Sequence, residues 1–459
     1  MNTHSVEFYR TKIADRFYDT WRMARRQGQC AWVTAALDLP WIDILSLVDE
    51  FEDIWVFSNQ GTQSVGVGIA RRWTYHGPHA WTDWKSDWDH LISEQSLPSD
   101  LQVGGGVAFS LDDMGQTQPW GAFPRMAWTL PAIMLQSSPN GIRARLVAEI
   151  DGNLPLNPVI NYYQELLDKI STPHPVSNAV PRLINHSSTP SRDQWNQLII
   201  DAVNTIKSQQ LSKVVVARAV TANFSDDVKT SPILHQLTNR NPSSKTFALR
   251  LQSRTFLGAT PEILLETQDP FVSTMALAGS APRGKTVTED FLNAQALLHH
   301  VKNREEHEAV KHHILNILQN LGCTVQYPRQ PIIKQLPTVQ HLFTPITATL
   351  PPGSTFWSVA QALQPTPAVG GLPPTAAIDW ITQHEPFDRG WYAGIIGHVS
   401  LKGQGQLLVA LRSALIEGRQ ATLFGGCGIM DQSNPDDEWE ESQWKLRSML
   451  EAMDVSEHL

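Results

Sequence analysis

The chain has 459 residues, of which 41% are hydrophobic, so it is long enough to bury a large core. Its formal net charge is −9, which excludes the uniformly basic surface typical of nucleic-acid-binding proteins. The three cysteines, Cys30, Cys323 and Cys427, are odd in number and far apart in sequence. This spacing argues against a disulfide framework and fits a reducing compartment.

The N-terminal segment carries acidic residues at Glu7, Asp15 and Asp19 and lacks the apolar core of a signal peptide. The most apolar long stretch, CAWVTAALDLPWIDIL, is interrupted by Asp38 and Asp43, so we predict no membrane-spanning helix. Together with the unpaired cysteines, these features lead us to expect a cytoplasmic protein.

The first third of the chain mixes short helical and strand patterns, of which VGVGIA is the plainest strand. Gly104 to Gly106 precede a strand-like run without a following Gly-Lys-Ser/Thr, so we expect a turn or bulge rather than a phosphate-binding loop. A segment rich in Pro, Ser and Thr predicts a linker at residues 176–190. It separates an N-terminal part, residues 1–175, from a C-terminal part, residues 191–459, and we expect one structural domain overall.

The C-terminal part opens with a helical pattern for which Ser191 is a suitable N-cap. The next run, KVVVARAVTANF, is rich in β-branched residues and predicts a strand. Alternation along this strand places Lys213 on the same face as Val215 and Ala217.

Further strand patterns are TFALRLQ, EILLET, GWYAGIIGHVSL, GQLLVALRSALI and QATLFGGCGIM. The last three follow one another with short polar connections and are predicted to be antiparallel neighbours. Helical patterns occur near residues 289–301, 303–321, 355–363 and 435–453. This order of elements favours an α+β sandwich over a doubly wound parallel sheet.

The helix predicted to begin at Asn303 carries an apolar stripe from Val310 to Leu321. One step of four residues back along this stripe leads to Glu306. A buried carboxylate there would need a cation or hydrogen bonds, because burying it unpaired costs several kcal/mol. Asn303 and Glu306 also have the N-cap to N3 spacing of a capping box, so a structural role is the alternative.

The last helix has a clear start, with Asn434 as N-cap and Pro435 at the first position. Glu438, Glu441 and Lys445 follow at spacings of three and four and share one face. Two carboxylates on adjacent turns are compatible with a bound Mg²⁺ ion. Acidic residues also favour helix N-termini, and Glu441 with Lys445 has the spacing of a surface ion pair, so both interpretations stay open.

Lys213 is the one charged residue on its strand face, which indicates either a catalytic base or a lysine whose stem lies along apolar surface. Glu262 precedes an apolar run and is either functional or a charge at a strand start. Arg412 lies in the apolar run LLVALRSAL, where an arginine usually meets a carboxylate of the protein or of a ligand.

The glycines around Cys427 expose backbone N–H groups that can bind an anion. These are Gly425, Gly426 and Gly428. Cys427 itself is expected to be a small apolar filler rather than a nucleophile, because no catalytic histidine motif accompanies it.

Ten motifs occur in one order: LSKVVVARAV, GATPEILL, ALAGSAPRG, KNREEHEAV, VQHLFTPI, LQPTPAVGG, RGWYAGIIG, VALRSAL, GGCGI and EWEESQWKL. Over residues 190–455 they resemble the chorismate-utilising enzymes, most closely the isochorismate synthases. The N-terminal segments GGGVAF and PWGAFPRMAWTLP strengthen that resemblance. It implies a fold like anthranilate synthase component I, with large antiparallel sheets packed face to face and helices outside.

The resemblance also implies site residues. Glu306 and Glu441 match Mg²⁺ ligands, and Glu438 matches an acid near the metal that often acts through water. The residues that match substrate-binding positions are Gly279, His341, Tyr392, Arg412, Gly426, Gly428 and Lys445.

Lys213 matches the lysine of family members that use water as nucleophile, where ammonia-using members carry glutamine. Water needs a base to attack ring carbon 2, whereas ammonia is already nucleophilic. Glu262 matches the general acid that protonates the departing carbon-4 hydroxyl. Ala278 stands where aminodeoxychorismate synthases place a nucleophilic lysine, so that covalent route is closed. Gln364-Pro365, where the family usually has His-Pro, is a small departure.

The implied activity is Mg²⁺-dependent conversion of chorismate to isochorismate for menaquinone or phylloquinone biosynthesis. The alternatives are a salicylate synthase, which also releases pyruvate, and an isochorismate synthase of a siderophore pathway. The expected partner is the small molecule chorismate, with no nucleic acid, no membrane and no glutaminase subunit.

Overall fold

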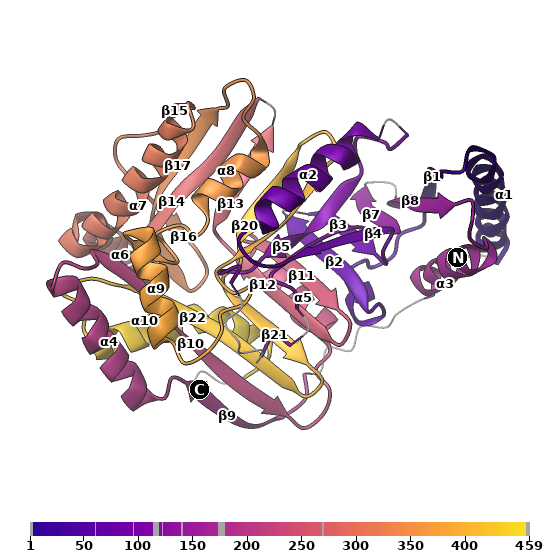
Figure 1. Ribbon diagram of the computed structural model, residues 1–459. Coiled ribbons are helices and arrows are strands. Elements are labelled where there is room, and N and C mark those ends of the chain that lie inside the picture. The colour runs from indigo at the N-terminus through magenta and orange to yellow at the C-terminus, as the bar shows by residue number, and fades with distance from the viewer. Residues whose placement is uncertain are drawn as a thin grey trace.

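Two large antiparallel β-sheets form the body of the molecule (Figure 1). The computed structural model describes residues 3–455 except residues 60, 95, 113–118, 122, 139–140, 173–179 and 269. Trp55 of one sheet stacks on His398 of the other, with 6.4 Å between the ring centroids, so the sheets pack face to face. The predicted sandwich of antiparallel sheets is confirmed.

The larger sheet has twelve strands among the described residues. In spatial order they are β1 (Cys30–Leu39), β8 (Gly141–Asp151), β7 (Ile133–Ser138), β3 (Thr62–Val67), β2 (Asp53–Asn59), β11 (Lys245–Leu251), β12 (Arg254–Thr260), β21 (Ser413–Glu417), β22 (Gln420–Ile429), β10 (Lys213–Phe224) and β18 (Gly371–Leu372), with β9 (Leu183–Thr189) also paired to β10.

The second sheet has ten strands among the described residues. Their order is β15 (Thr324–Gln326), β17 (Val339–Thr349), β14 (Phe271–Pro282), β13 (Ile263–Gln268), β20 (Gly405–Val409), β19 (Ile395–Ser400), β5 (Gln102–Val107), β6 (Met126–Leu130) and β4 (Arg71–Tyr75), with β16 (Ile332–Gln335) also paired to β17.

Helices pack on these sheets, with α7 on β14 and β17, α10 on β22, and α1 on β1 and β8 (Figure 1). The described helices are α1 (Thr3–Gln27), the 3₁₀ helix η1 (Ser46–Asp49), α2 (Ala80–Ser93), α3 (Asn157–Ser171), α4 (Arg192–Lys207), α5 (Thr230–Arg240), α6 (Val287–His299), α7 (Val301–Asn320), α8 (Phe356–Leu363), α9 (Pro374–His384) and α10 (Pro435–Ala452). In the described part of the chain, no helix is long and apolar enough to cross a membrane.

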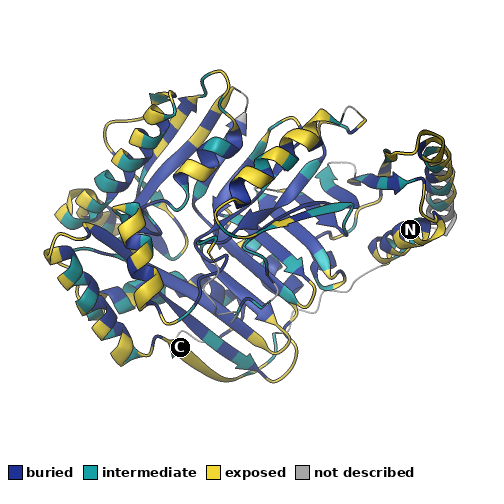
Figure 2. Cartoon of the chain, viewed as in Figure 1, coloured by how far each residue is buried: buried dark blue, intermediate teal, exposed yellow. Residues whose placement is uncertain are grey.

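The hydrophobic core lies on both faces of the larger sheet. One cluster fills the space between the two sheets and contains Trp55 and Phe256. A second cluster lies between the larger sheet and its helices, where Phe17 of α1 and Met449 of α10 are fully buried. Figure 2 shows the result, with buried strands and helices whose outer faces are exposed.

Strands from both predicted parts are neighbours in each sheet, because β2 pairs with β11 and β5 pairs with β19. Residues 176–179, the start of the predicted linker, lie outside the described residues. Residues 183–189 form β9 and pair with β10, so this half of the predicted linker is a strand. Its residues after Leu183 and Ile184 are all polar and most of the strand is exposed, so it lacks the apolar alternation from which a strand is predicted.

The run GQLLVALRSALI was predicted as one strand, and this was wrong. The chain leaves β20 in the second sheet after Val409 and enters β21 in the larger sheet at Ser413. Arg412 lies in this crossing with φ of 51°, the left-handed region that side chains rarely adopt. The predicted pairing therefore holds for β19 with β20 and for β21 with β22, but the two pairs belong to different sheets.

The predicted helix caps were right at two of three positions. Ser191 closes a capping box with Gln194, and the Asn434 side chain accepts a hydrogen bond from the backbone N–H of Asp436. Helix α7 begins two residues earlier than expected, with His300 rather than Asn303 as N-cap. Glu306 therefore lies beyond the first turn and does not close a capping box.

Gly104 to Gly106 lie within strand β5 rather than in a turn or bulge before it. A Cβ atom on Gly104 would come within 2.6 Å of the Trp55 ring. Glycine is therefore needed here so that the indole of the facing sheet can pack against the β5 backbone.

Candidate active site

A cavity with about 690 Å³ of empty space, part of it open to solvent, collects nine of the twelve predicted site residues. The nine are Glu262, Gly279, Glu306, His341, Tyr392, Arg412, Gly426, Gly428 and Lys445. The other three, Lys213, Glu438 and Glu441, do not line this cavity. Each of them contacts a charged side chain, as described below.

Lys213 and Glu306 form a buried ion pair, with 2.9 Å between Nζ and Oε1. Lys213 starts β10 and is fully buried, while Glu306 reaches over from α7. Gly428 of β22 lies between them, because a Cβ atom there would be 2.5 Å from Glu306 Oε1 and 2.9 Å from Lys213 Cε. Burial alone would raise the pKa of Glu306, but the charge of Lys213 lowers it overall.

Helix α10 places Glu438 and Glu441 beside lysines. The Nζ of Lys302 donates to Glu438 Oε1 at 2.9 Å, and the Nζ of Lys445 lies 2.6 Å from Glu441 Oε1. Burial raises the pKa of Glu438, and the nearby charge of Glu441 raises it further. Burial would lower the pKa of Lys302, but the charges of Glu438, Glu441 and Glu306 raise it overall. One ammonium group is thus within electrostatic reach of all three predicted metal-site carboxylates.

The described residues contain no group of three or more His, Cys, Asp or Glu side chains that lie close enough to hold a metal ion together. The three carboxylates instead hold Lys213, Lys302 and Lys445. Their chemistry nevertheless fits Mg²⁺, which prefers carboxylate oxygens. Oε2 of Glu438 is buried without a hydrogen-bond partner among the described residues, and this leaves one oxygen available to a cation.

Glu262 immediately precedes strand β13 and is buried, with 4% of its surface exposed. Its backbone N–H donates to the Thr260 hydroxyl at 3.2 Å, and its carbonyl accepts from Val409 N–H at 3.1 Å. Burial raises the pKa of Glu262 to about 7, although Lys213 and Lys334 act in the opposite direction. A carboxyl group with this pKa is about half protonated at neutral pH and can donate a proton.

Arg412 is a buried guanidinium without a carboxylate partner in the described part of the chain. Its Nη2 lies 3.5 Å from His341 Nε2, and its buried Nη1 has no hydrogen-bond partner there. Burial lowers the pKa of Arg412 to about 10, so the group stays charged at neutral pH. Burial and the charge of Arg412 hold the pKa of His341 well below its usual range. The cavity therefore presents a cation with a free donor beside a neutral histidine, which suits an anionic ligand.

Tyr392 and Gly426 form the wall next to Arg412. The Tyr392 ring stacks on Phe424 with 5.2 Å between centroids, and burial raises the pKa of the hydroxyl to about 12, so it stays a neutral donor. Gly426 lies on β22 opposite Ala217 of β10. Whether the N–H groups of Gly426 and Gly428 bind an anion stays a prediction.

Gly279 and Ser280 bring strand β14 to the cavity. The strand register shifts between Ala278 and Ser280, and Gly279 has φ of 76°, which glycine adopts readily. The hydroxyl of Ser280 lies 3.0 Å from His341 Nδ1. Sequence reasoning identified Gly279 and His341 but not the serine that links them.

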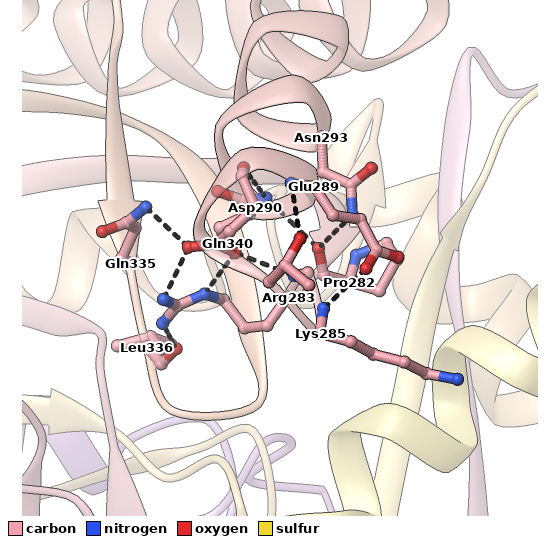
Figure 3. A network of polar contacts seen from close by, with 11 residues as sticks. Pro282, Arg283, Lys285, Glu289, Asp290, Asn293, Gln335, Leu336 and Gln340 are labelled. Atoms are coloured by element: carbon pink, nitrogen blue, oxygen red, sulfur yellow. Dashed lines mark hydrogen bonds and ion pairs between the residues drawn. The ribbon is translucent and has the colours of Figure 1, made fainter.

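A polar network fixes the loop between β14 and α6, two residues beyond Ser280 (Figure 3). Arg283 donates to both carboxylate oxygens of Asp290 at 2.7 Å, and Asp290 also accepts from the backbone N–H of Gly284 at 2.9 Å. The amide of Gln335 donates to Asp290 Oδ2 at 3.2 Å. The Arg283 guanidinium lowers the pKa of Asp290 to about 2. This network ties β14 and α6 to β16 beside the cavity.

Sequence reasoning also missed Lys302 and Lys334. Lys302 precedes Glu306 by four residues, and this helical spacing was a usable signal that both side chains share a face. Lys334 lies on the short edge strand β16, where no sequence pattern distinguished it.

Fold and site together are those of an enzyme that binds a small anionic substrate between two antiparallel sheets. A family model described as chorismate binding enzyme matches residues 19–454, and the chain belongs to this family. The resemblance inferred from the ten motifs is thereby confirmed.

Relatives and solved structures agree with this assignment. Isochorismate synthase MenF from Bacillus subtilis is 33% identical over 377 residues, which are 81% of this chain and 79% of that protein. The salicylate biosynthesis isochorismate synthase of Pseudomonas aeruginosa is 40% identical over 267 residues, 58% of this chain and 56% of that protein.

Two solved structures share the fold. The structure of MenF, the menaquinone-specific isochorismate synthase from Escherichia coli, has a TM-score of 0.79 at 25% identity and covers 95% of this chain and 99% of that one. Anthranilate synthase component I from Streptococcus pneumoniae has a TM-score of 0.65 at 19% identity, covering 91% and 92%. The second comparison concerns the fold alone.

Proposed function

We propose that this protein is an isochorismate synthase that uses water as nucleophile and requires Mg²⁺. The observation that carries the proposal is Glu262, a buried carboxyl group with a pKa of about 7 in a cavity that also contains Arg412 and Lys445. Such a cavity offers a proton donor and two cations to a substrate with two carboxylates. The names of the relatives support the same reaction.

Arg412 and Lys445 would bind substrate carboxylate. The free Nη1 of Arg412 lacks a hydrogen-bond partner among the described residues, so a substrate oxygen would satisfy it. Lys445 pairs with Glu441 on α10 and can share its ammonium protons with a substrate oxygen. Tyr392 adds a neutral hydroxyl donor on the same wall.

The reaction needs one proton removed from water and one proton given to the leaving hydroxyl. We assign the first transfer to Lys213 and the second to Glu262. The hydroxyl formed from water bonds to carbon 2, and the carbon-4 hydroxyl leaves as water, so the reaction is an isomerisation overall. Each transfer would contribute roughly 10²–10⁴-fold to the rate.

Lys213 can accept a proton only as the neutral amine, so Glu306 needs another positive partner in the working site. Glu306 and Glu441 would hold Mg²⁺, with Glu438 nearby. When bound, Mg²⁺ would supply positive charge to these carboxylates and to a substrate carboxylate.

The experiment is to incubate the purified protein with chorismate and Mg²⁺ and to separate the products by chromatography. We expect isochorismate without pyruvate, no need for ammonium, and loss of activity on chelation that added Mg²⁺ restores. Pyruvate with salicylate would establish the lyase alternative instead, and full activity in a chelator would exclude the metal requirement.

We assign the product to quinone rather than siderophore or salicylate biosynthesis. The match to a MenF protein covers 81% of the chain, including N-terminal residues, whereas the match to the salicylate-pathway relative covers 58%. The gene should restore menaquinone to a bacterium that lacks its own menaquinone-specific enzyme. Restoration of siderophore production alone would contradict this assignment.

A further inference from the structure

Lys334 approaches the predicted acid from the edge strand β16. It pairs with His341 of β17 in the strand register, so it lies one strand away from a cavity residue. Its Nζ donates to the carbonyl oxygen of Pro261 at 2.7 Å and lies 3.9 Å from Met275 Sδ. The ammonium group is thus anchored to the residue that immediately precedes Glu262.

Among the described residues, no carboxylate forms an ion pair with Lys334. Four cations face Glu262: Lys213 from β10, Lys334 from β16, Lys445 from α10 and Arg412 from the β20–β21 crossing. Lys213 pairs with Glu306 and Lys445 pairs with Glu441. In the described part of the chain, the contacts of Lys334 are the Pro261 carbonyl, the Met275 sulfur and the Phe343 ring.

Lys334 also does not line the cavity, unlike Arg412 and Lys445. Its charge is therefore placed to act on Glu262 rather than on a substrate carboxylate. The effect is mutual, because burial lowers the pKa of Lys334 and the charge of Glu262 counteracts that shift. Thr366, 3.5 Å from Glu262 Oε1, is the neutral polar neighbour.

We propose that Lys334 is a positioning residue that holds the backbone at Pro261 in place and makes the Glu262 carboxyl a stronger acid. This inference rests on the proposed role of Glu262 as proton donor. A buried carboxyl without a nearby cation stays protonated to higher pH and gives up its proton less readily. Lys334 supplies a fixed cation without blocking the cavity.

The test compares Lys334→Gln, which keeps a donor for the Pro261 carbonyl but removes the charge, with Lys334→Arg, which keeps the charge. We expect the alkaline limb of the kcat/KM pH profile to move up by about one pH unit in Lys334→Gln and to stay near its wild-type position in Lys334→Arg. Lys207→Gln, at an exposed position of α4, is the matched control and should leave the profile unchanged. An unchanged alkaline limb in Lys334→Gln would overturn the proposal.

A second measurement keeps the inference separate from the role of Glu262 in the reaction. The infrared band of the protonated Glu262 carboxyl can be assigned by its loss in Glu262→Gln and titrated without substrate. The titration midpoint of this band should rise in Lys334→Gln. If Glu262→Gln proves active, that result refutes only the role of Glu262 as acid and leaves the effect of Lys334 on its pKa to be read from the midpoint. A midpoint equal to that of the wild type would overturn the influence of Lys334.

Discussion

Lys213 Nζ and Glu306 Oε1 lie 2.9 Å apart across the face of Gly428. This contact joins the strand that carries the proposed base to the helix that carries a proposed metal ligand. Both side chains are largely withdrawn from water, and each places an opposite charge next to the other. The two functions assigned from the sequence are thus coupled in one ion pair.

Replacing Lys213 by Ala should abolish turnover and leave chorismate binding largely intact, because Arg412 and Lys445 remain. The variant should also lose about 3–5 kcal/mol of stability, since Glu306 would lose its ion-pair partner. Steady-state kinetics, calorimetric titration with chorismate and chemical denaturation measure the three effects.

The matched control is Lys311→Ala. Lys311 pairs with Glu308 at 2.6 Å on α7, the helix that carries Glu306, and it does not line the cavity. The control variant should retain turnover. Near-normal turnover in Lys213→Ala would refute the assignment of the base.

The protonation of Glu262 links activity and stability to pH. Its pKa is raised from 4.5 to about 7, so the folded state binds a proton that the unfolded state has released between these values. The contribution of Glu262 to the free energy of unfolding is therefore greatest below pH 4.5. It decreases as the pH rises to about 7, by about 3 kcal/mol in total. Activity that depends on the protonated acid should fall in the same alkaline direction.

Glu262→Gln should be inactive and should lose less stability than the wild type between pH 6 and pH 8. Denaturant midpoints at the two pH values measure the difference. Equal changes in midpoint for both proteins would show that Glu262 does not titrate in this range.

Removing the Arg412 guanidinium should weaken chorismate binding about 10- to 100-fold, the value of one or two hydrogen bonds to a charged group. Arg412→Met should also melt at a temperature no lower than the wild type, because a buried cation without a carboxylate is costly. Calorimetric titration and thermal unfolding test the two parts. Unchanged affinity would place the substrate carboxylates elsewhere in the cavity.

Asp290→Asn should raise KM several-fold with a smaller effect on kcat, because Asp290 anchors the loop between β14 and α6 and touches no reacting group (Figure 3). Asn293→Ala, which removes a single 3.4 Å hydrogen bond to the Pro282 carbonyl, serves as control. If KM is equal in both variants and the wild type, the network does not shape the site.

The sequence predicted helices and their caps well, but it did not predict where the chain passes from one sheet to the other. Helix α10 and the cap of α4 followed from capping residues and apolar spacing, which act over a few residues. The crossing at Arg412 was missed because both flanking strands are apolar and neither proline nor glycine marks the change of sheet.

The site residues also divide into those that local sequence motifs predict and those that depend on contacts between distant segments. The motifs identified nine residues that line one cavity, but the partners of Lys213 and Glu438 come from contacts between distant segments. Glu441 instead pairs with Lys445 on its own helix, as the spacing of four residues allowed. Lys302 could have been predicted from its position four residues before Glu306 on helix α7. Lys334 acts through a backbone carbonyl, a contact that no side-chain pattern records.

The origin of the new hydroxyl tests the central claim most directly. Chorismate should be converted in water enriched in ¹⁸O, and the isochorismate formed should be analysed by mass spectrometry during the first turnovers. Attack by water activated through Lys213 predicts one ¹⁸O atom per isochorismate, located on carbon 2, and none in unreacted chorismate. Isochorismate without label would mean that the substrate's own hydroxyl migrates, and this would contradict the assignment of water as nucleophile.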